Sequence, residues 1–322
     1  MHRRRVLQAG AAMGAAVMGA ASARARVADE RWSDHDRARE LPLRLRWPDG
    51  NAPCALVVYS HGLGGSREGG DAWGRAWRDS GLAVIHVQHP GSDTDTLRQG
   101  MFALRRAASG EQLAARVADM HFVLDEIERR SRAGPGPWTR VRLDAIGAAG
   151  HSFGAQTVQS LAGKRFPMRT PGFIDPRYRA FIAFSASLGR GDPSSPGQQF
   201  GAVTRPFLAV TGSLDGDPLG GDMNAEDRAR VYDGLPRGQR ALLWLDGADH
   251  MTFSGNAEQR IAGRRGPFRR EPAVAAAEDA HHALVARVTT LWWRAHLLGD
   301  ADARVALTSP EGLGAADRWR MD

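Results

Sequence analysis

The sequence predicts an α/β fold with a mainly parallel central sheet that is covered by helices on both faces. The first observation is a series of short apolar runs bounded by turn residues, which is typical of strands buried on both faces. The second is that helical patterns lie between these runs, as crossover helices between parallel strands do. The third is size: 322 residues that are 42% hydrophobic can form one large core.

The apolar runs define the expected strands. They span residues 55–60, 82–87, 145–149, 180–185, 207–211 and 241–246. Residues 41–47 alternate apolar and polar side chains and precede these runs, so they predict an antiparallel edge strand. No linker or internal repeat divides the chain after residue 25.

The expected helices follow from apolar residues spaced three and four apart. One helix is expected to begin after a capping Ser109, and another begins at Phe153. Two further helices are marked by pairs and runs of apolar residues: Trp73 and Trp77, and Val285, Val288, Leu291 and Trp292. Trp73 and Trp77 are interpreted as core residues.

The N-terminal segment predicts export. Residues 1–25 combine consecutive arginines, a short alanine-rich apolar stretch and an Ala-Arg-Ala cleavage site. The arginine pair before Val6 and Leu7 resembles a twin-arginine signal, which exports folded proteins from bacteria. Because the apolar stretch is short, no stable membrane span is expected. We therefore expect an exported protein, periplasmic or secreted, whose residues 26–322 form a single domain.

The charge pattern does not indicate a nucleic-acid partner. The formal net charge is +7, but residues 1–25 carry four arginines and no acidic residue, so their removal would leave +3. Acidic residues are interspersed with the arginines, and no basic stripe with interleaved aromatic residues is present. Cys54 is the single cysteine, so no internal disulfide is expected and we interpret it as a packing residue.

The segment GHSFG places Ser152 between Gly150 and Gly154. It lies between a predicted strand and the predicted helix that begins at Phe153, which is the context that exposes a serine oxygen above a parallel sheet. Small flanking residues are needed because such a turn brings the two backbones close together. A serine hydroxyl is a poor nucleophile at neutral pH, so Ser152 requires a base and a group that orients the base.

The candidate base and acid follow later strands. His250 comes after the last apolar run, and Asp215 follows the run at residues 207–211. The order Ser152, Asp215, His250 is the order that α/β-hydrolases use. Asp217 lies two residues further on and is the alternative acid. His86 and His89 follow an early strand and are expected to be structural, with His89 also a candidate for the pocket wall.

An oxyanion hole is expected from two backbone amides. One is the amide of Phe153, directly after the nucleophile, and the other is that of Leu63 in the glycine-rich segment SHGLGG. Ligands in open α/β sheets bind beyond the carboxyl ends of the strands. The long connections at residues 90–108 and 163–177 are therefore candidates for a pocket wall or cap.

Several motifs together carry a family resemblance. SHGLGGSREG, VQHPGSD, GHSFGAQT, TGSLDGDP and DGADHMTFSG, in this order, resemble bacterial α/β-hydrolases related to platelet-activating-factor acetylhydrolase and dienelactone hydrolase. The resemblance covers roughly residues 40–297. It implies hydrolysis of carboxylic esters with Ser152 as nucleophile, His250 as base and then acid, and Asp215 orienting it. Dienelactone hydrolases proper use a cysteine where this chain has Ser152.

The sequence thus predicts a serine hydrolase that cleaves a small-molecule or lipid-like carboxylic ester through an acyl-enzyme intermediate. Neither a cofactor nor a metal ion is required for this chemistry. Lactones, short-chain phospholipids and polyesters are alternative substrates for the same triad. The alternative class is a non-catalytic periplasmic binding protein on the same fold.

Overall fold

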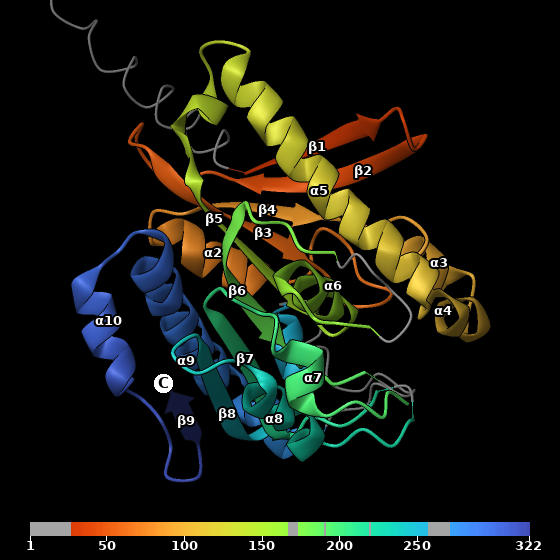
Figure 1. Ribbon diagram of the computed structural model, residues 1–322, viewed down its shortest axis with the longest axis vertical. Coiled ribbons are helices and arrows are strands. Elements are labelled where there is room, and N and C mark those ends of the chain that lie inside the picture. Colours follow the sequence, from red (N-terminus) through yellow and green to blue (C-terminus); the bar gives the residue numbers. More distant parts are fainter. Residues whose placement is uncertain (1–26, 167–172, 190, 219, 257–270) are drawn as a thin grey trace, which may run out of the picture.

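The structure is a computed structural model that describes residues 27–166, 173–189, 191–218, 220–256 and 271–322 (Figure 1). The export signal predicted at residues 1–25 lies outside the described residues. None of the helices in the described ranges is both long and apolar enough to cross a membrane.

A nine-stranded sheet forms the centre of the described structure, with strand order β1-β2-β4-β3-β5-β6-β7-β8-β9. Strands β4, β3, β5, β6, β7 and β8 are parallel neighbours, as the sequence predicts. The antiparallel strands β1, β2 and β9 flank this parallel part. The strands are β1 (Val27–Asp34), β2 (Arg39–Arg46), β3 (Cys54–Ser60), β4 (Ala83–Val87), β5 (Val141–His151), β6 (Tyr178–Phe184), β7 (Phe207–Leu214), β8 (Arg240–Asp249) and β9 (Arg318–Met321).

Two strands at the sheet edges were not predicted. The strand expected at residues 41–47 is antiparallel, but the expectation that it forms the edge is wrong, because β1 pairs along its outer side. Strand β1 has a largely exposed and polar pattern, so it lacks the apolar run of a buried strand. At the other edge, the C-terminal strand β9 pairs with β8.

Helices cover both faces of the sheet (Figure 1). Alternate residues of each strand point to opposite faces, so Leu56 and Val58 join one buried cluster with α5, α6, α7 and α8, and Val57 joins another with α2, α9 and α10. The helices are α2 (Asp71–Asp79), α3 (Thr94–Arg98), α4 (Met101–Ala107), α5 (Gly110–Arg132), α6 (Phe153–Ala162), α7 (Pro196–Phe200), α8 (Ala225–Gly234), α9 (Pro272–Leu297) and α10 (Ala301–Thr308), with short 3-10 turns at η1 (Pro137–Arg140) and η2 (Thr252–Ser254).

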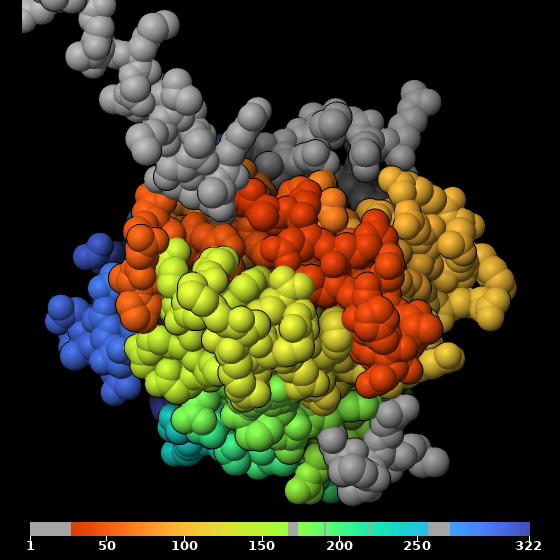
Figure 2. Space-filling view, turned by 90° about the horizontal axis from the view of Figure 1, so that it is seen from above, coloured from red at the N-terminus to blue at the C-terminus, as the bar shows by residue number. Residues whose placement is uncertain are grey.

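Helix α5 begins as the sequence predicts and buries an unexpected pair of charges. The Ser109 side chain accepts a hydrogen bond from the Gln112 amide, which caps the first turn. The apolar stripe of α5 faces the sheet. Arg116 and Asp119 on the same helix are also fully buried. Figure 2 shows the hairpin of β1 and β2 (red) beside α5 (yellow), and the Arg37–Asp119 ion pair joins the two.

The connection at residues 90–108 forms α3 and α4 and contacts the loop after β3. The Gly64 amide donates to the Ser92 carbonyl at 2.9 Å, and Gly65 forms an isolated parallel bridge with Asp93. Leu104 is buried, whereas Phe102 is 77% exposed. This segment therefore lies against the glycine-rich loop. Its role as a pocket wall stays a prediction. Residues 167–172 of the second candidate connection lie outside the described residues.

The tryptophans of α2 belong to the core, as predicted. Trp73 stacks on Phe184 with ring centroids 5.4 Å apart, and Trp77 meets Trp293 edge to face at 5.7 Å. The Trp77 indole donates to the Thr289 hydroxyl at 3.0 Å, so its polar atom is satisfied although the side chain is buried.

Trp77→Ala should lower the free energy of unfolding by about 3–5 kcal/mol, because it removes a fully buried aromatic ring and leaves a cavity. The matched control is Phe102→Ala, which removes a ring that is 77% exposed and should change the free energy by less than about 1 kcal/mol. Urea unfolding of both variants measures the difference. Equal losses in the two variants would contradict this core assignment.

Candidate active site

Ser152 lies in a sharp turn between β5 and α6. Its backbone has φ 56° and ψ −113°, a conformation that non-glycine residues rarely adopt and that costs on the order of 1–3 kcal/mol. The turn is held on both sides: the Ser152 amide donates to the Phe184 carbonyl at 2.9 Å, and the Ser152 carbonyl accepts from the Gln156 amide at 3.1 Å. Ser152 is partly exposed.

The two glycines flanking Ser152 are required by backbone contacts. A Cβ atom on Gly150 would lie 2.5 Å from the Gly154 carbonyl oxygen, and a Cβ atom on Gly154 would overlap the Ser60 carbonyl oxygen. Ser60 ends β3, so the first turn of α6 rests directly on the backbone of the neighbouring strand. The sequence expectation for these small residues thus has a direct steric cause.

The three residues predicted as a triad are brought together at the carboxyl ends of β5, β7 and β8. The His250 Nε2 atom lies 2.9 Å from the Ser152 Oγ atom, and the His250 Nδ1 atom lies 2.7 Å from an Asp215 carboxylate oxygen. His250 is buried, and Asp215 is completely inaccessible. The carboxylate within hydrogen-bonding distance of His250 is therefore that of Asp215, whereas Asp217 was the alternative.

Asp215 is held ionised by its surroundings. Its carboxylate accepts a hydrogen bond from the Thr211 hydroxyl at 2.8 Å and forms an ion pair with Arg228 at 3.0 Å. Burial opposes ionisation, but the Arg228 guanidinium and His250 outweigh it and lower the pKa of Asp215 below its ordinary value. Arg228 also donates to the Asp215 carbonyl at 2.8 Å, so it fixes the backbone as well as the charge.

His151 is a site residue that sequence reasoning missed. It precedes Ser152, and its Nε2–H donates to the His250 carbonyl at 2.9 Å, while the two rings lie 4.7 Å apart. Burial and the neighbouring His250 hold the pKa of His151 well below its ordinary value, so the ring is neutral. His151 therefore supports the backbone of His250 without adding charge. The sequence signal that could have identified His151 was its position directly before Ser152 in the GHSFG segment.

The two amides predicted as oxyanion donors lie on the segments that flank Ser152. Within the described part of the chain, neither the Leu63 N–H nor the Phe153 N–H donates to a protein acceptor. The preceding carbonyl, that of Gly62, accepts hydrogen bonds from the Gly65 amide and from the His61 ring. In a trans peptide the C=O and N–H groups point to opposite sides. The Leu63 N–H therefore points away from the Gly65 amide and the His61 ring, which bond to the Gly62 carbonyl.

The two early histidines are buried, as the structural interpretation predicts. His86 bonds to the Gly69 carbonyl, and burial lowers its pKa to about 3. His89 is completely inaccessible, so it does not line a pocket wall. Among the described residues, no group of three or more His, Cys, Asp and Glu side chains is arranged to hold a metal ion.

The sheet order, the flanking helices and the strand-turn-helix at Ser152 define the α/β-hydrolase fold. Among solved structures, the chain is similar to the ferulic acid esterase from Streptomyces cinnamoneus, with 21% sequence identity, 84% of this chain and 89% of that chain covered, and a TM-score of 0.60. No protein-family model matches the chain, and no curated protein matches its sequence. The likeness shows a shared fold. The finer resemblance to acetylhydrolases and dienelactone hydrolases stays a prediction.

The buried histidines give a directional pH dependence of stability. Burial lowers the pKa of His89 to about 4 and that of His86 to about 3, and it also lowers the pKa values of His61 and His151. Below pH 6.5 the unfolded chain binds protons that the folded chain excludes, so stability falls as the pH falls towards 4. Each of these histidines changes the free energy of unfolding by roughly 1 kcal/mol per pH unit in this range.

Urea unfolding at pH 7.0 and pH 5.5 should therefore give a lower free energy of unfolding at the acidic pH. The His86→Gln variant removes one of these titrating groups and should show a smaller difference between the two pH values. A free energy that is equal or higher at pH 5.5 in the unsubstituted protein would contradict the neutral, buried state of these histidines.

Proposed function

We propose that this protein is a serine esterase that hydrolyses carboxylic esters through an acyl-enzyme intermediate. The observation that carries the proposal is the continuous chain from Ser152 Oγ through His250 to Asp215, with contacts of 2.9 Å and 2.7 Å. These contacts join the hydroxyl of Ser152, a partly exposed residue, to a base, and they join the base to a buried, ionised carboxylate. The fold that the chain shares with a ferulic acid esterase is consistent with this chemistry.

In the proposed reaction, the Ser152 oxygen attacks the ester carbonyl carbon and His250 Nε2 takes the hydroxyl proton. The tetrahedral intermediate collapses, the bond to the alcohol oxygen breaks, and His250 returns the proton to that oxygen. A water molecule then attacks the acyl-enzyme with the same proton transfers and releases the acid. Asp215 orients the His250 ring and stabilises its protonated form.

The negative charge that develops on the carbonyl oxygen needs donors that are fixed before the reaction. We assign this role to the amides of Leu63 and Phe153, because among the described residues neither donates to a protein acceptor and both are available to an oxyanion. Phe153 is the first residue of α6, so the positive end of the helix dipole also faces the oxyanion.

The proposed substrate class, carboxylic esters, is broader than the substrate in the name of the similar solved structure. That protein is a ferulic acid esterase, so esters of ferulic acid belong in the substrate panel. Lactones, short-chain phospholipids and polyesters are the other acyl substrates that the same triad would serve. A non-catalytic binding protein is the outcome that remains if no ester is turned over.

Ser152→Ala should lower ester hydrolysis by about 10⁴-fold or more, because no other group replaces the nucleophile. The measurement is initial-rate hydrolysis of p-nitrophenyl esters from acetyl to palmitoyl, together with methyl ferulate. The variant retains the turn and its glycines, so its unfolding transition should match that of the unsubstituted protein. Equal activity of the two proteins would disprove the serine mechanism.

Asp215→Asn should lower kcat by roughly 10³–10⁴-fold, because the base loses its orienting charge. Asp217→Asn is the matched control: it makes the same chemical change two residues away and should leave kcat within about threefold. Both are measured with the p-nitrophenyl ester that the unsubstituted protein hydrolyses fastest. The reverse ranking of the two variants would assign the acid to Asp217.

A further inference from the structure

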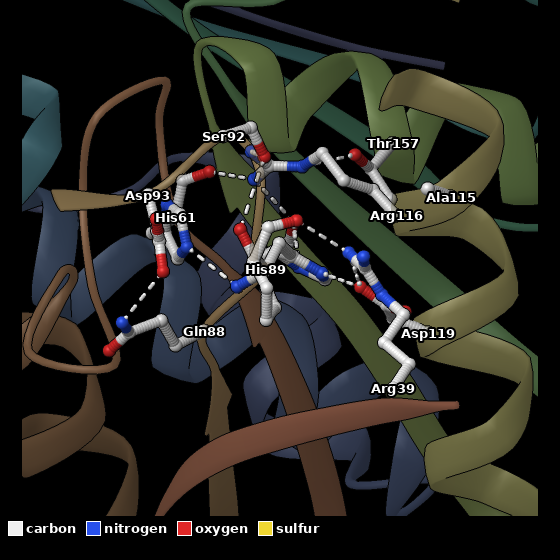
Figure 3. Close-up of polar contacts among 12 residues, drawn as sticks. Arg39, His61, Gln88, His89, Ser92, Asp93, Ala115, Arg116, Asp119 and Thr157 are labelled. Carbon is white, nitrogen blue, oxygen red and sulfur yellow. Dashed lines mark hydrogen bonds and ion pairs between the residues drawn. The ribbon is translucent and has the colours of Figure 1, made fainter. Parts of the chain in front are cut away.

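Behind the candidate active site, α5 carries a completely buried arginine, Arg116. Its guanidinium donates to the Ser60 hydroxyl at 3.1 Å, the Ser92 hydroxyl at 3.1 Å and the Thr157 hydroxyl at 3.3 Å, and it also donates to the His61 carbonyl. Figure 3 shows the side chain reaching from α5 towards these partners, with His61 and Ser92 on one side and Thr157 on the other.

A second series of hydrogen-bonded residues, Ser60, His89 and Asp119, supports this arginine, and Figure 3 shows His89 and Asp119 of this series. The Ser60 hydroxyl donates to His89 Nε2 at 3.0 Å, and His89 Nδ1–H donates to Asp119 at 2.9 Å. Asp119 is in turn paired with Arg39 at 2.6 Å. Ser60, His89 and Asp119 are all completely inaccessible, and the Ser60 oxygen already accepts from Arg116. No substrate can reach this serine, so the chain is a structural support and not a second nucleophilic site.

Burial of the positively charged Arg116 guanidinium costs free energy. This cost argues that Arg116 has a specific role. Among the described residues, Arg116 forms no ion pair with a carboxylate, and its hydrogen-bond acceptors are hydroxyls and one carbonyl. Burial lowers its pKa to about 9, although Asp119 acts in the opposite direction. A buried polar network of this kind fixes geometry when all its members are satisfied and fails when one is removed.

Three of the four partners of Arg116, all except Ser92, belong to the two segments that supply the proposed oxyanion donors. Through Ser60 and His61 the guanidinium holds the chain just before Leu63. It contacts Thr157, whose hydroxyl donates to the Phe153 carbonyl at the start of α6 at 3.1 Å, and it also lies 4.8 Å from the centroid of the Phe153 ring. The Leu63 and Phe153 amides come from separate segments. The distance between the two amides therefore depends on the contacts that hold those segments together.

Resting on the esterase function proposed above, we propose that Arg116 is a positioning residue of the oxyanion hole. It clamps the loop after β3 to the start of α6, and the Ser60–His89–Asp119 chain holds the clamp in place. Loss of the clamp changes the spacing of the two amides, and such misplacement lowers transition-state stabilisation more than substrate binding.

The first test is the kinetics of Arg116→Lys, which keeps the positive charge but cannot contact all four acceptors. We expect kcat for a p-nitrophenyl ester to fall about 10–100-fold, with KM changed by less than about threefold. The matched control is Arg130→Lys on the same helix, whose guanidinium lies over the Trp32 ring at 4.4 Å and contacts neither oxyanion segment. It should leave kcat unchanged.

A second readout separates positioning from a general structural role. A thionoester places sulfur, a weak hydrogen-bond acceptor, where the ester has its carbonyl oxygen, so its hydrolysis depends less on the oxyanion donors. In Arg116→Lys the preference for the ester over the matching thionoester, measured as a ratio of kcat/KM values, should fall about 5-fold or more. A structural defect alone would lower both substrates equally and leave the ratio unchanged, which would overturn the proposal.

The outcomes also separate this inference from the proposed function. If Ser152→Ala is as active as the unsubstituted protein, the esterase mechanism itself fails and the inference falls with it. If Ser152→Ala is inactive and Arg116→Lys keeps full kcat and the same ester preference, only the role of Arg116 fails. Should Arg116→Lys not fold, Ser60→Ala removes one acceptor of the clamp and should show the same fall in ester preference, and an unchanged preference would overturn the proposal.

Discussion

The candidate active site depends on one close backbone contact, between the end of β3 and the first turn of α6. A side chain on Gly154 would overlap the Ser60 carbonyl oxygen, and one on Gly150 would strike the Gly154 carbonyl oxygen. With both glycines in place, Ser152 is held at a positive φ and Phe153 begins its helix beside the loop that carries Leu63. The proposed nucleophile and both proposed oxyanion donors are therefore positioned by the same packing interaction.

Two chains of serine, histidine and aspartate meet at this contact, and they differ in access. Ser152 is partly exposed, whereas Ser60 is completely buried and its oxygen is already occupied by Arg116. The residue types and distances are alike in the two chains, so they do not by themselves define a nucleophile. Partial exposure of Ser152, together with its turn between strand and helix, distinguishes it as the proposed nucleophile. The buried series Ser60–His89–Asp119 instead supports the backbone on which the Ser152 turn rests.

Much of this arrangement could be predicted from the sequence. The parallel strands are apolar runs, and parallel strands end at the same edge of a sheet, so residues that follow them, such as Asp215 and His250, were expected to meet. The edge strands β1 and β9 carry mostly exposed residues and gave no such signal. Arg116 and Arg228 lie on helices of an arginine-rich chain, where a buried arginine has the same sequence appearance as a solvated one.

The most direct test of the central claim is covalent labelling with a fluorophosphonate, followed by mass spectrometry of the intact protein and of its peptides. Such reagents form a stable adduct with a serine that is activated by a base and is accessible to solvent. We expect one phosphonate per chain, located on the peptide that contains Ser152. Absence of an adduct, or an adduct on any other residue, including Ser60, would contradict the assignment of Ser152 as the nucleophile.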